Sequence, residues 1–334
     1  MLKRLKLLLI ASLSLLLILA GCGSSESGKN EDGGDSNGGK EEKTYKIGVT
    51  QIVEHDSLNA AFEGFKKALA DQGLKVEYDI KNAQGDMNTN ATIGKDLANS
   101  DVDLIFANST PSAQAVLSNT KEIPIVFTSV TDPVGAELVQ SFENPGGNVT
   151  GTTDTHPDAI PNTVKFITQN FNVKNIGTIY NAGEQNSVAQ IQIVKDALKG
   201  TGVNLVEKSV STSADVKQAA ESLVGSADVI YIITDNTVVS ALESVISVAQ
   251  DNDLPLFVGE LDSVRKGGFA AYGFDYFDIG YEAGLMAAKI LKGEKKPSEL
   301  PVQYPQNLKL LINKKAAAEM GVEIDESWDA EFYE

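Results

Sequence analysis

Hydroxyl side chains around Pro111 and at positions 128 and 129 could together form a site for a carboxylate group. Thr110 and Ser112 flank Pro111, a residue favoured in the first turn of a helix, so free backbone N–H groups and hydroxyls would converge on one point. Thr128 and Ser129 end the neighbouring expected strand and could complete this site from the side. The alternative, which the sequence leaves open, is that these hydroxyls only cap their own helices.

Three carboxylates in the second half of the chain could bind the opposite charge, an ammonium group. Asp235, Glu260 and Asp275 each follow an expected strand, so they would face the carboxylate site from the other half of the molecule. A buried ammonium needs such a partner because an unpaired charge is costly to remove from water. Asp235 is our first choice. As a helix cap with Thr237 nearby it also has a purely structural explanation, and Asp275 has the same ambiguity.

A flat or apolar wall would complete a site for an aromatic group. Tyr180 stands at the end of an expected strand and is the clearest candidate, although most aromatic residues in such a chain belong to the core. Asn186, at the start of the next expected helix, could add hydrogen bonds. Glu54 and His55 open the first loop and are expected to border the same group, with an ordinary polar loop residue as the alternative for His55.

Few residues could perform catalysis or bind a metal. The two histidines are His55 and His156, and the single cysteine is Cys22, so neither a zinc cluster nor a cysteine nucleophile is supported. No Gly-x-x-x-x-Gly-Lys-Ser/Thr loop occurs, and no Gly-x-Gly-x-x-Gly fingerprint follows the first strand. We therefore expect a protein that is not an enzyme and uses no metal or cofactor. An extracellular hydrolase built on a carboxylate pair is the competing class, and a turnover screen would separate the two.

The elements that must position these residues alternate between short apolar strands and amphipathic helices from Thr44 onward. This alternation of strands and helices predicts parallel sheets covered by helices on both faces. The strands of the first series are expected at residues 45–53, 76–80, 104–107 and 123–128. Those of the second are expected at residues 175–180, 204–210, 229–234, 254–259, 268–274 and 308–312.

Two such series predict two doubly wound, Rossmann-like α/β lobes joined by a multi-strand hinge. The first lobe is expected to comprise residues 44–151 plus 275–302, and the second residues 152–274 plus 303–334. In open sheets of this kind the ligand lies beyond the carboxyl ends of the strands, where the candidate binding residues named above are found. A hinge between the lobes would let the molecule close on that ligand.

The amino-terminal residues predict export and a lipid anchor. Lys3, Arg4 and Lys6 precede an apolar run, and small residues stand directly before Cys22, so residues 1–22 have the form of a bacterial lipoprotein signal peptide with Cys22 as the acylated residue. The alternative is a signal anchor with an incidental cysteine. Residues 23–43 contain no large apolar residue and predict a flexible tether. The protein is therefore expected on the extracytoplasmic face of the cell membrane.

The charge of the chain argues against a nucleic-acid partner. The formal net charge is −18, and loss of the three basic residues of the signal would make it −21. A phosphate backbone is bound by clustered lysine and arginine, whereas basic residues are outnumbered and dispersed here. We expect a monomer that binds no nucleic acid.

Several motifs make the chain similar to a known family. It resembles the extracytoplasmic solute receptors of ABC importers, which have the type I periplasmic-binding-protein fold, and specifically the branch that includes tryptophan/tyrosine receptors. The likeness covers nearly all of residues 44–320. The stretches that show it are Glu54-His55, residues 82–86 (NAQGD), 124–128 (PIVFT) with 131–136 (TDPVGA), 144–151 (NPGGNVTG), 180–187 (YNAGEQNS) and 234–237 (TDNT).

This resemblance implies a two-lobed receptor that closes on one small molecule and delivers it to an ABC permease with its ATPase. Aromatic amino acids, meaning tryptophan, tyrosine or phenylalanine, are the best-attested ligands of this branch. For such a zwitterion the hydroxyl site would take the carboxylate, and one of the three carboxylates would take the ammonium. A tethered sensor that presents its ligand-bound form to a signalling partner is the alternative, because the fold serves both roles.

Overall fold

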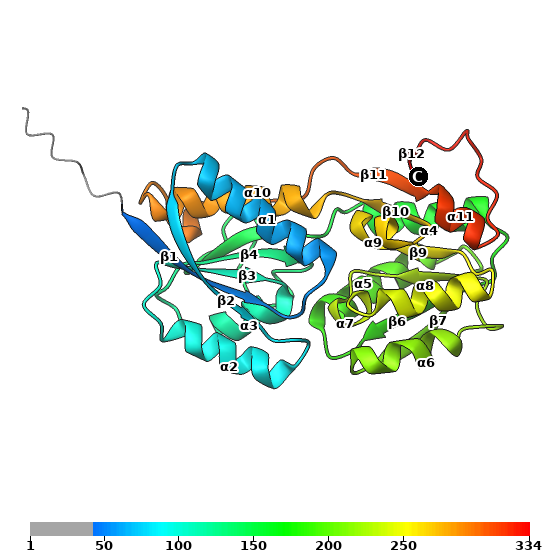
Figure 1. Ribbon diagram of the computed structural model, residues 1–334, viewed down its shortest axis with the longest axis horizontal. Coiled ribbons are helices and arrows are strands. Elements are labelled where there is room, and N and C mark those ends of the chain that lie inside the picture. The colour runs from blue at the N-terminus through cyan, green and yellow to red at the C-terminus, as the bar shows by residue number, and fades with distance from the viewer. Residues whose placement is uncertain (1–42) are drawn as a thin grey trace, which may run out of the picture. The chain divides into compact units, whose positions relative to one another are not determined.

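The computed structural model describes residues 43–334, which belong to one compact unit. The expected signal peptide, Cys22 and the tether up to residue 42 lie outside the described residues. None of the helices within residues 43–334 has the length and hydropathy that a membrane crossing requires. The described chain forms two sheets, each covered by its own set of helices (Figure 1).

The first lobe is built on five parallel strands in the order β2-β1-β3-β4-β5. The central strands are continuous apolar runs that are buried on both faces, as expected for a parallel sheet between two layers of helices. The strand bounds are β1 (Thr44–Gln51), β2 (Lys75–Asn82), β3 (Leu104–Asn108), β4 (Ile125–Val130) and β5 (Val149–Thr153).

Helices cover both faces of this sheet, with α1 and α10 on one face and α2 and α3 on the other (Figure 1). Helices α1 and α10 pack along each other at very short range because Gly64 and Gly280 lack side chains. A Cβ at either glycine would overlap a backbone carbonyl oxygen of the partner helix. The helix bounds are α1 (Asp56–Asp71), α2 (Met87–Ala98), α3 (Thr110–Leu117) and α10 (Tyr276–Leu291).

The second lobe has seven strands in the order β12-β11-β10-β9-β8-β6-β7. All neighbouring pairs are parallel except β10 and β11, which are antiparallel. The strand bounds are β6 (Asn175–Asn181), β7 (Asn204–Val210), β8 (Val229–Ile232), β9 (Leu256–Val258), β10 (Ala270–Gly273), β11 (Lys309–Asn313) and β12 (Glu331–Tyr333).

The helices of the second lobe are shorter on average than α1 and α10, and two short 3₁₀ helices also occur. The helix bounds are α4 (Ala159–Asn170), α5 (Gln185–Leu198), α6 (Val216–Glu221), α7 (Asn236–Val239), α8 (Leu242–Asp251), α9 (Leu261–Lys266) and α11 (Lys314–Glu319). The 3₁₀ helices are η1 (Ser213–Asp215) in this lobe and η2 (Pro297–Glu299), which contacts β5 of the first lobe.

The chain passes between the two sheets three times, which forms the hinge. It first leaves β5 for α4, then leaves β10 for α10, and finally returns from η2 to β11. Thr152 and Gln303, on the first and third crossings, form an isolated parallel β-bridge. The fold class predicted from the sequence is therefore confirmed, with two α/β lobes and more than one connecting strand.

Several details differ from the sequence-based expectations. Between β8 and β9 the structure has two helices, α7 and α8, separated at residues 240–241. Strand β5 was not predicted because Thr and Gly fill three of its central positions, although all five residues are buried. Because β5 runs to Thr153 in the first sheet, it extends two residues past the expected lobe boundary at 151. The boundaries themselves stay a prediction.

Candidate functional site

Six polar side chains at the carboxyl ends of strands define the candidate site, which we call the strand-end cluster. Each has a buried polar atom without a hydrogen-bond partner among residues 43–334. Leaving such an atom unpaired costs about 1–3 kcal/mol, so unpaired atoms at strand ends indicate a functional role. Within the described residues, Thr50, Asn90, Thr178 and Gln185 also have a buried polar atom without a partner. The cluster consists of His55, Ser57 and Thr110 from the first lobe and Asn186, Thr234 and Glu260 from the second lobe.

The two halves of the strand-end cluster lie against each other across the lobes. His55 lies beside the Asn236 side chain, and Ser57 lies beside Glu260 close enough to favour its ionised form. A direct hydrogen bond also joins the lobes, because Gln190 Nε2 donates to Thr131 Oγ1 over 3.4 Å. The site is therefore formed by both lobes together.

Asn108 holds the strand ends of the first lobe in place. Its buried amide donates to Gln51 Oε1 at 3.0 Å and to the carbonyl oxygen of Leu58 at 2.7 Å. Its Oδ1 accepts a hydrogen bond from Ser129 Oγ at 2.9 Å. Ser129 has a φ of 57° and Ser109 a φ of 124°, conformations that non-glycine residues adopt at a cost and that often occur at functional sites.

The four hydroxyls predicted to bind a carboxylate have different surroundings. All four residues are buried. Thr128 Oγ1 lies 2.8 Å from Thr152 Oγ1, Ser129 donates to Asn108, and Ser112 Oγ accepts from Ser109 Oγ at 3.1 Å. Thr110 Oγ1 has no partner. Thr110 is therefore the one of these four hydroxyls that makes no hydrogen bond among the described residues.

Asp235, our first choice for the ammonium, is engaged within its own lobe. Its carboxylate accepts hydrogen bonds from Asn181 N at 2.6 Å, Ser187 Oγ at 2.6 Å and Val238 N at 2.8 Å. Burial raises the pKa of Asp235, and the nearby Glu184 carboxylate raises it further. These contacts make Asp235 the N-cap of α7, which is the structural alternative that the sequence left open.

Glu260 is also buried, but half of its carboxylate is free. Oε1 accepts a hydrogen bond from Ser263 Oγ at 2.7 Å, whereas Oε2 has no partner. Burial raises the pKa of Glu260 to about 7, with smaller contributions from the charges of Asp262 and Asp154. Glu260 can therefore accept a hydrogen bond from a cationic group, and ion pairing would favour its charged form.

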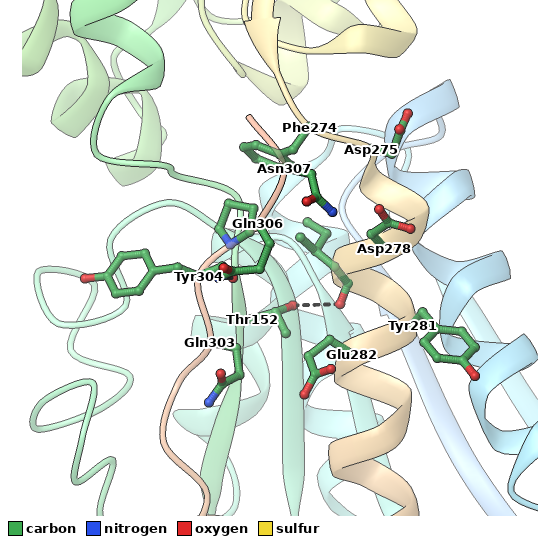
Figure 2. Close-up of a pocket in the computed structure, with 12 residues that line it drawn as sticks. Thr152, Phe274, Asp275, Asp278, Tyr281, Glu282, Gln303, Tyr304, Gln306 and Asn307 are labelled. Atoms are coloured by element: carbon green, nitrogen blue, oxygen red, sulfur yellow. Dashed lines mark hydrogen bonds between the residues drawn. The ribbon is translucent and has the colours of Figure 1, made fainter. Parts of the chain in front are cut away.

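Asp275 forms ion pairs away from the strand-end cluster. Its Oδ1 lies 2.7 Å from Arg265 Nη2, and its Oδ2 lies 3.5 Å from Lys309 Nζ. Partial burial would raise the pKa of Asp275, but these two cations bring it below its usual value. It lines a pocket of about 540 Å³ beside the hinge, where Thr152 donates a hydrogen bond to the Ile279 carbonyl oxygen (Figure 2). No member of the strand-end cluster lines that pocket.

Two other predicted residues also lie apart from the strand-end cluster. The Tyr180 hydroxyl donates to Glu207 Oε2 at 3.1 Å, on the neighbouring strand β7, and Tyr180 is partly exposed. Glu54 is exposed, whereas the adjacent His55 is only 8% exposed. Asn186, in contrast, is within the cluster, and its Nδ2 donates to Glu184 and Ser187.

Asp154 is a buried residue near this site that the sequence analysis missed. It accepts hydrogen bonds from Thr131 Oγ1 and from the Tyr276 hydroxyl, both at 2.9 Å. Burial raises its pKa to about 6, although both hydrogen bonds lower it. Asp154 directly follows β5, so recognition of that strand would have placed it among the strand-end residues.

Aromatic residues stand beside Asp154. A small cavity of about 20 Å³ is lined by Asp154, Thr234 of the strand-end cluster and the rings of Tyr231, Tyr272 and Phe274. The Phe274 ring stacks on Tyr276, with the ring centroids 5.7 Å apart and the planes inclined by 15°. These rings, and not Tyr180, supply an apolar wall next to the cluster.

Within residues 43–334, no group of three or more His, Cys, Asp or Glu side chains is placed to hold a metal ion. What the site offers instead is a set of hydrogen-bonding groups from both lobes, with one half-free carboxylate and an aromatic wall nearby. Such an arrangement can bind a small polar molecule that carries a flat apolar part.

Comparisons with known proteins agree with this chemistry. A family model described as ABC transporter substrate binding protein matches residues 46–331. A tyrosine-binding protein of Clostridioides difficile (strain R20291) is 42% identical over 316 residues, which cover 93% of this chain and 90% of that protein.

Two solved structures are similar in different degrees. An ABC domain in complex with L-Trp from Streptococcus pneumonia is 34% identical, covers 87% of this chain and 99% of its own, and has a TM-score of 0.82. A ligand-free, open structure of a substrate binding protein with adhesive properties from Clostridium difficile is 40% identical, covers 86% of this chain and 99% of its own, and has a TM-score of 0.63. The chain is therefore more like the L-Trp complex in structure, although it is less like it in sequence.

Proposed function

The chain belongs to the family of ABC transporter substrate-binding proteins, and from this premise we propose that it is a receptor for an aromatic amino acid, tryptophan or tyrosine in the first place. The observation that carries the proposal is the strand-end cluster, in which both lobes contribute buried polar atoms without partners. A zwitterionic ligand between the lobes would satisfy these atoms. Its binding would then stabilise the closed arrangement of the lobes.

We assign the ligand's ammonium group to Glu260. Of the three carboxylates predicted for this role, Glu260 is the one with a buried oxygen that has no partner. Asp235 is occupied by three donors of its own lobe, and Asp275 is paired with Arg265 and Lys309. A buried ammonium requires a partner that is not already neutralised, and Glu260 meets this requirement.

We assign the ligand's carboxylate to Thr110 and the start of α3. Thr110 Oγ1 is buried and unpaired at the first position of α3, an eight-residue helix in which Ser109 Oγ already accepts a hydrogen bond from Ser112 N. Glu260 approaches from the second lobe beside Ser57 of the first. The two charged ends of an amino acid would then be held by different lobes, so that only a ligand with both ends bridges them.

The aromatic part of the ligand is assigned to the wall formed by Phe274, Tyr231 and Tyr272. The stacking of Phe274 on Tyr276 and the hydrogen bond from Tyr276 to Asp154 keep this wall in a fixed orientation. Aromatic groups pack well against such rings. Phe274 lies at the second hinge crossing, where closure of the lobes would also orient its ring.

The finer cellular role is part of the same proposal. We propose that Cys22 carries a lipid anchor, that the receptor works as a monomer on the extracytoplasmic face, and that it delivers its ligand to an ABC permease. The motif before Cys22 supports the anchor. Growth with a labelled fatty acid should label the wild-type protein and leave Cys22→Ala unlabelled and released from the membrane.

A ligand panel tests the proposal directly. L-tryptophan, L-tyrosine and L-phenylalanine should raise the melting temperature in a concentration-dependent way, and calorimetry should give one site per chain. Tryptamine lacks the carboxylate and indole-3-propionic acid lacks the ammonium, so both should bind far more weakly than L-tryptophan. The ligand should be recovered unchanged. Absence of binding by all three amino acids would refute the proposed function.

A further inference from the structure

His55 is a member of the strand-end cluster with no role in binding an amino acid's charged ends. It directly precedes α1 and takes the N-cap position, yet its side chain makes no capping hydrogen bond. The residue is 8% exposed, and its Nδ1 is buried without a hydrogen-bond partner. The ring therefore has an unused hydrogen-bonding atom inside the site.

The surroundings of His55 determine which kind of bond Nδ1 can make. The pKa of His55 is lowered to about 4, mainly by burial and also by the charge of Lys266, while Asn236 and Asp56 oppose this change. The imidazole is therefore neutral at pH 7, with one nitrogen that donates and one that accepts. Asn236 lies beside the ring and favours a ring N–H, as a hydrogen-bond acceptor does. Nδ1 is the buried nitrogen without a partner, and it is the acceptor when Nε2 carries the ring proton.

We propose that His55 Nδ1 accepts a hydrogen bond from the polar hydrogen of the ligand's ring, the indole N–H of tryptophan or the phenol O–H of tyrosine. This inference rests on the proposed function and adds the basis of its selectivity. Phenylalanine has no such hydrogen, so it would leave the buried acceptor unpaired. A site that hydrogen-bonds one ligand discriminates strongly against an analogue that lacks the donor.

Two other members of the cluster are already assigned to groups that do not distinguish these ligands. Glu260 and Thr110 are assigned to the ammonium and the carboxylate, which all three aromatic amino acids share. Asn186 lies among the buried groups around Glu184 and Ser187 and donates to both of them. His55 is the imidazole of the cluster, and it lies where the first lobe meets α7 and α9 of the second.

Two substitutions separate the hydrogen bond from the shape of the side chain. His55→Leu removes the acceptor with a similar volume, and His55→Asn keeps a polar atom near the position of Nδ1. Calorimetry of the full chain should show that wild type binds tryptophan and tyrosine about tenfold more tightly than phenylalanine. In His55→Leu this preference should disappear through weaker binding of tryptophan and tyrosine, with phenylalanine changed by less than about threefold. His55→Asn should recover part of the preference for tryptophan and tyrosine over phenylalanine.

Methylated ligands provide a readout that a purely structural role would not change. 1-Methyltryptophan lacks the indole N–H, so it should bind more weakly than tryptophan to wild type, and this difference should shrink in His55→Leu. Glu63→Gln, an exposed change on the same helix, is the control and should behave as wild type. Equal losses for all three amino acids in His55→Leu, or equal wild-type affinity for phenylalanine and tyrosine, would overturn the inference alone. If wild type binds none of them, the proposed function fails and the inference falls with it.

Discussion

The starts of α7 and α9 place a carboxylate at the same point of the fold, but the two carboxylates have opposite surroundings. Asp235 and Glu260 are both buried N-cap residues that follow parallel strands of the second lobe. Asp235 caps its own helix through Val238 N and accepts two further hydrogen bonds. Glu260 makes no capping bond and keeps one oxygen unpaired beside Ser57 of the other lobe.

The difference shows how one methylene group separates a structural residue from a candidate ligand-binding residue. Aspartate is short enough to reach the N–H groups of its own first turn, which is why it is a preferred cap. Glutamate is longer and a poorer cap, so at this position its carboxylate extends past the helix start. At this N-cap position Oε1 accepts a hydrogen bond from Ser263 of the same helix, and Oε2 stays available for a partner outside it.

The largest effect should come from Glu260→Gln, which tests whether the free carboxylate binds the ligand. The change keeps the size of the side chain and removes the charge opposite a buried ammonium. We expect the affinity for tryptophan and tyrosine to fall by about 3.5 kcal/mol, a few hundredfold, as measured by calorimetry. The ligand-free protein should be at least as stable as wild type at pH 8, since burial of the Glu260 charge is unfavourable.

Ser263→Ala is the matched control for this variant. It removes the hydrogen bond to Oε1 and leaves Oε2 and the charge in place. Its effect on affinity should be much smaller than that of Glu260→Gln. Similar affinity losses in the two variants would mean that the position of α9, and not the charge of Glu260, determines binding.

Asp154 is a third buried carboxylate, and it differs from both Asp235 and Glu260. Each of its oxygens accepts a hydrogen bond, and both donors are hydroxyl groups. Burial raises its pKa from 3.8 to about 6. Its folded state therefore binds a proton more tightly than the unfolded state, so wild type loses stability as the pH rises from about 4 to 6. In Asp154→Asn this loss, up to about 3 kcal/mol, should be absent.

Urea unfolding between pH 4 and pH 7.5 measures this difference. The contribution of His55 to the free energy of unfolding rises with pH over part of the same range, because burial lowers its pKa. Both proteins contain His55, so this contribution cancels when their curves are compared. Asp101→Asn, at a fully exposed position, is the control and should keep the wild-type pH dependence. Parallel curves for wild type and Asp154→Asn would show that Asp154 keeps its charge at no cost.

The sequence predicted the architecture well because buried parallel strands and amphipathic helices have strong patterns. Strand β7 was predicted with its observed bounds, residues 204–210. Strand β5 was missed because its stability depends on distant partners. Thr150 Oγ1 and Thr152 Oγ1 donate to the Leu300 and Ile279 carbonyl oxygens, contacts that a local pattern cannot show.

The site was predictable only as a set of strand-end positions. Asp235, Glu260 and Asp275 look alike in sequence, since each is acidic and follows a strand. Their roles depend on whether neighbouring elements supply donors, as Asn181 and Ser187 do for Asp235 and Arg265 does for Asp275. Those donors come from other parts of the chain, so the choice between a cap, an ion pair and a binding residue required the structure.

The smallest expected effect, on stability and not on binding, comes from Asp235→Ala. It leaves Asn181 N, Ser187 Oγ and Val238 N without their acceptor, so unfolding should become easier by about 2 kcal/mol. Asp235→Asn keeps one acceptor oxygen for the cap and should lose less. Affinity for tryptophan and tyrosine, measured by calorimetry below the melting temperature, should change by less than about threefold in both variants. A hundredfold loss of affinity in Asp235→Asn with unchanged stability would reverse the comparison, because it would give the ammonium site to α7 and leave Glu260 as the structural residue.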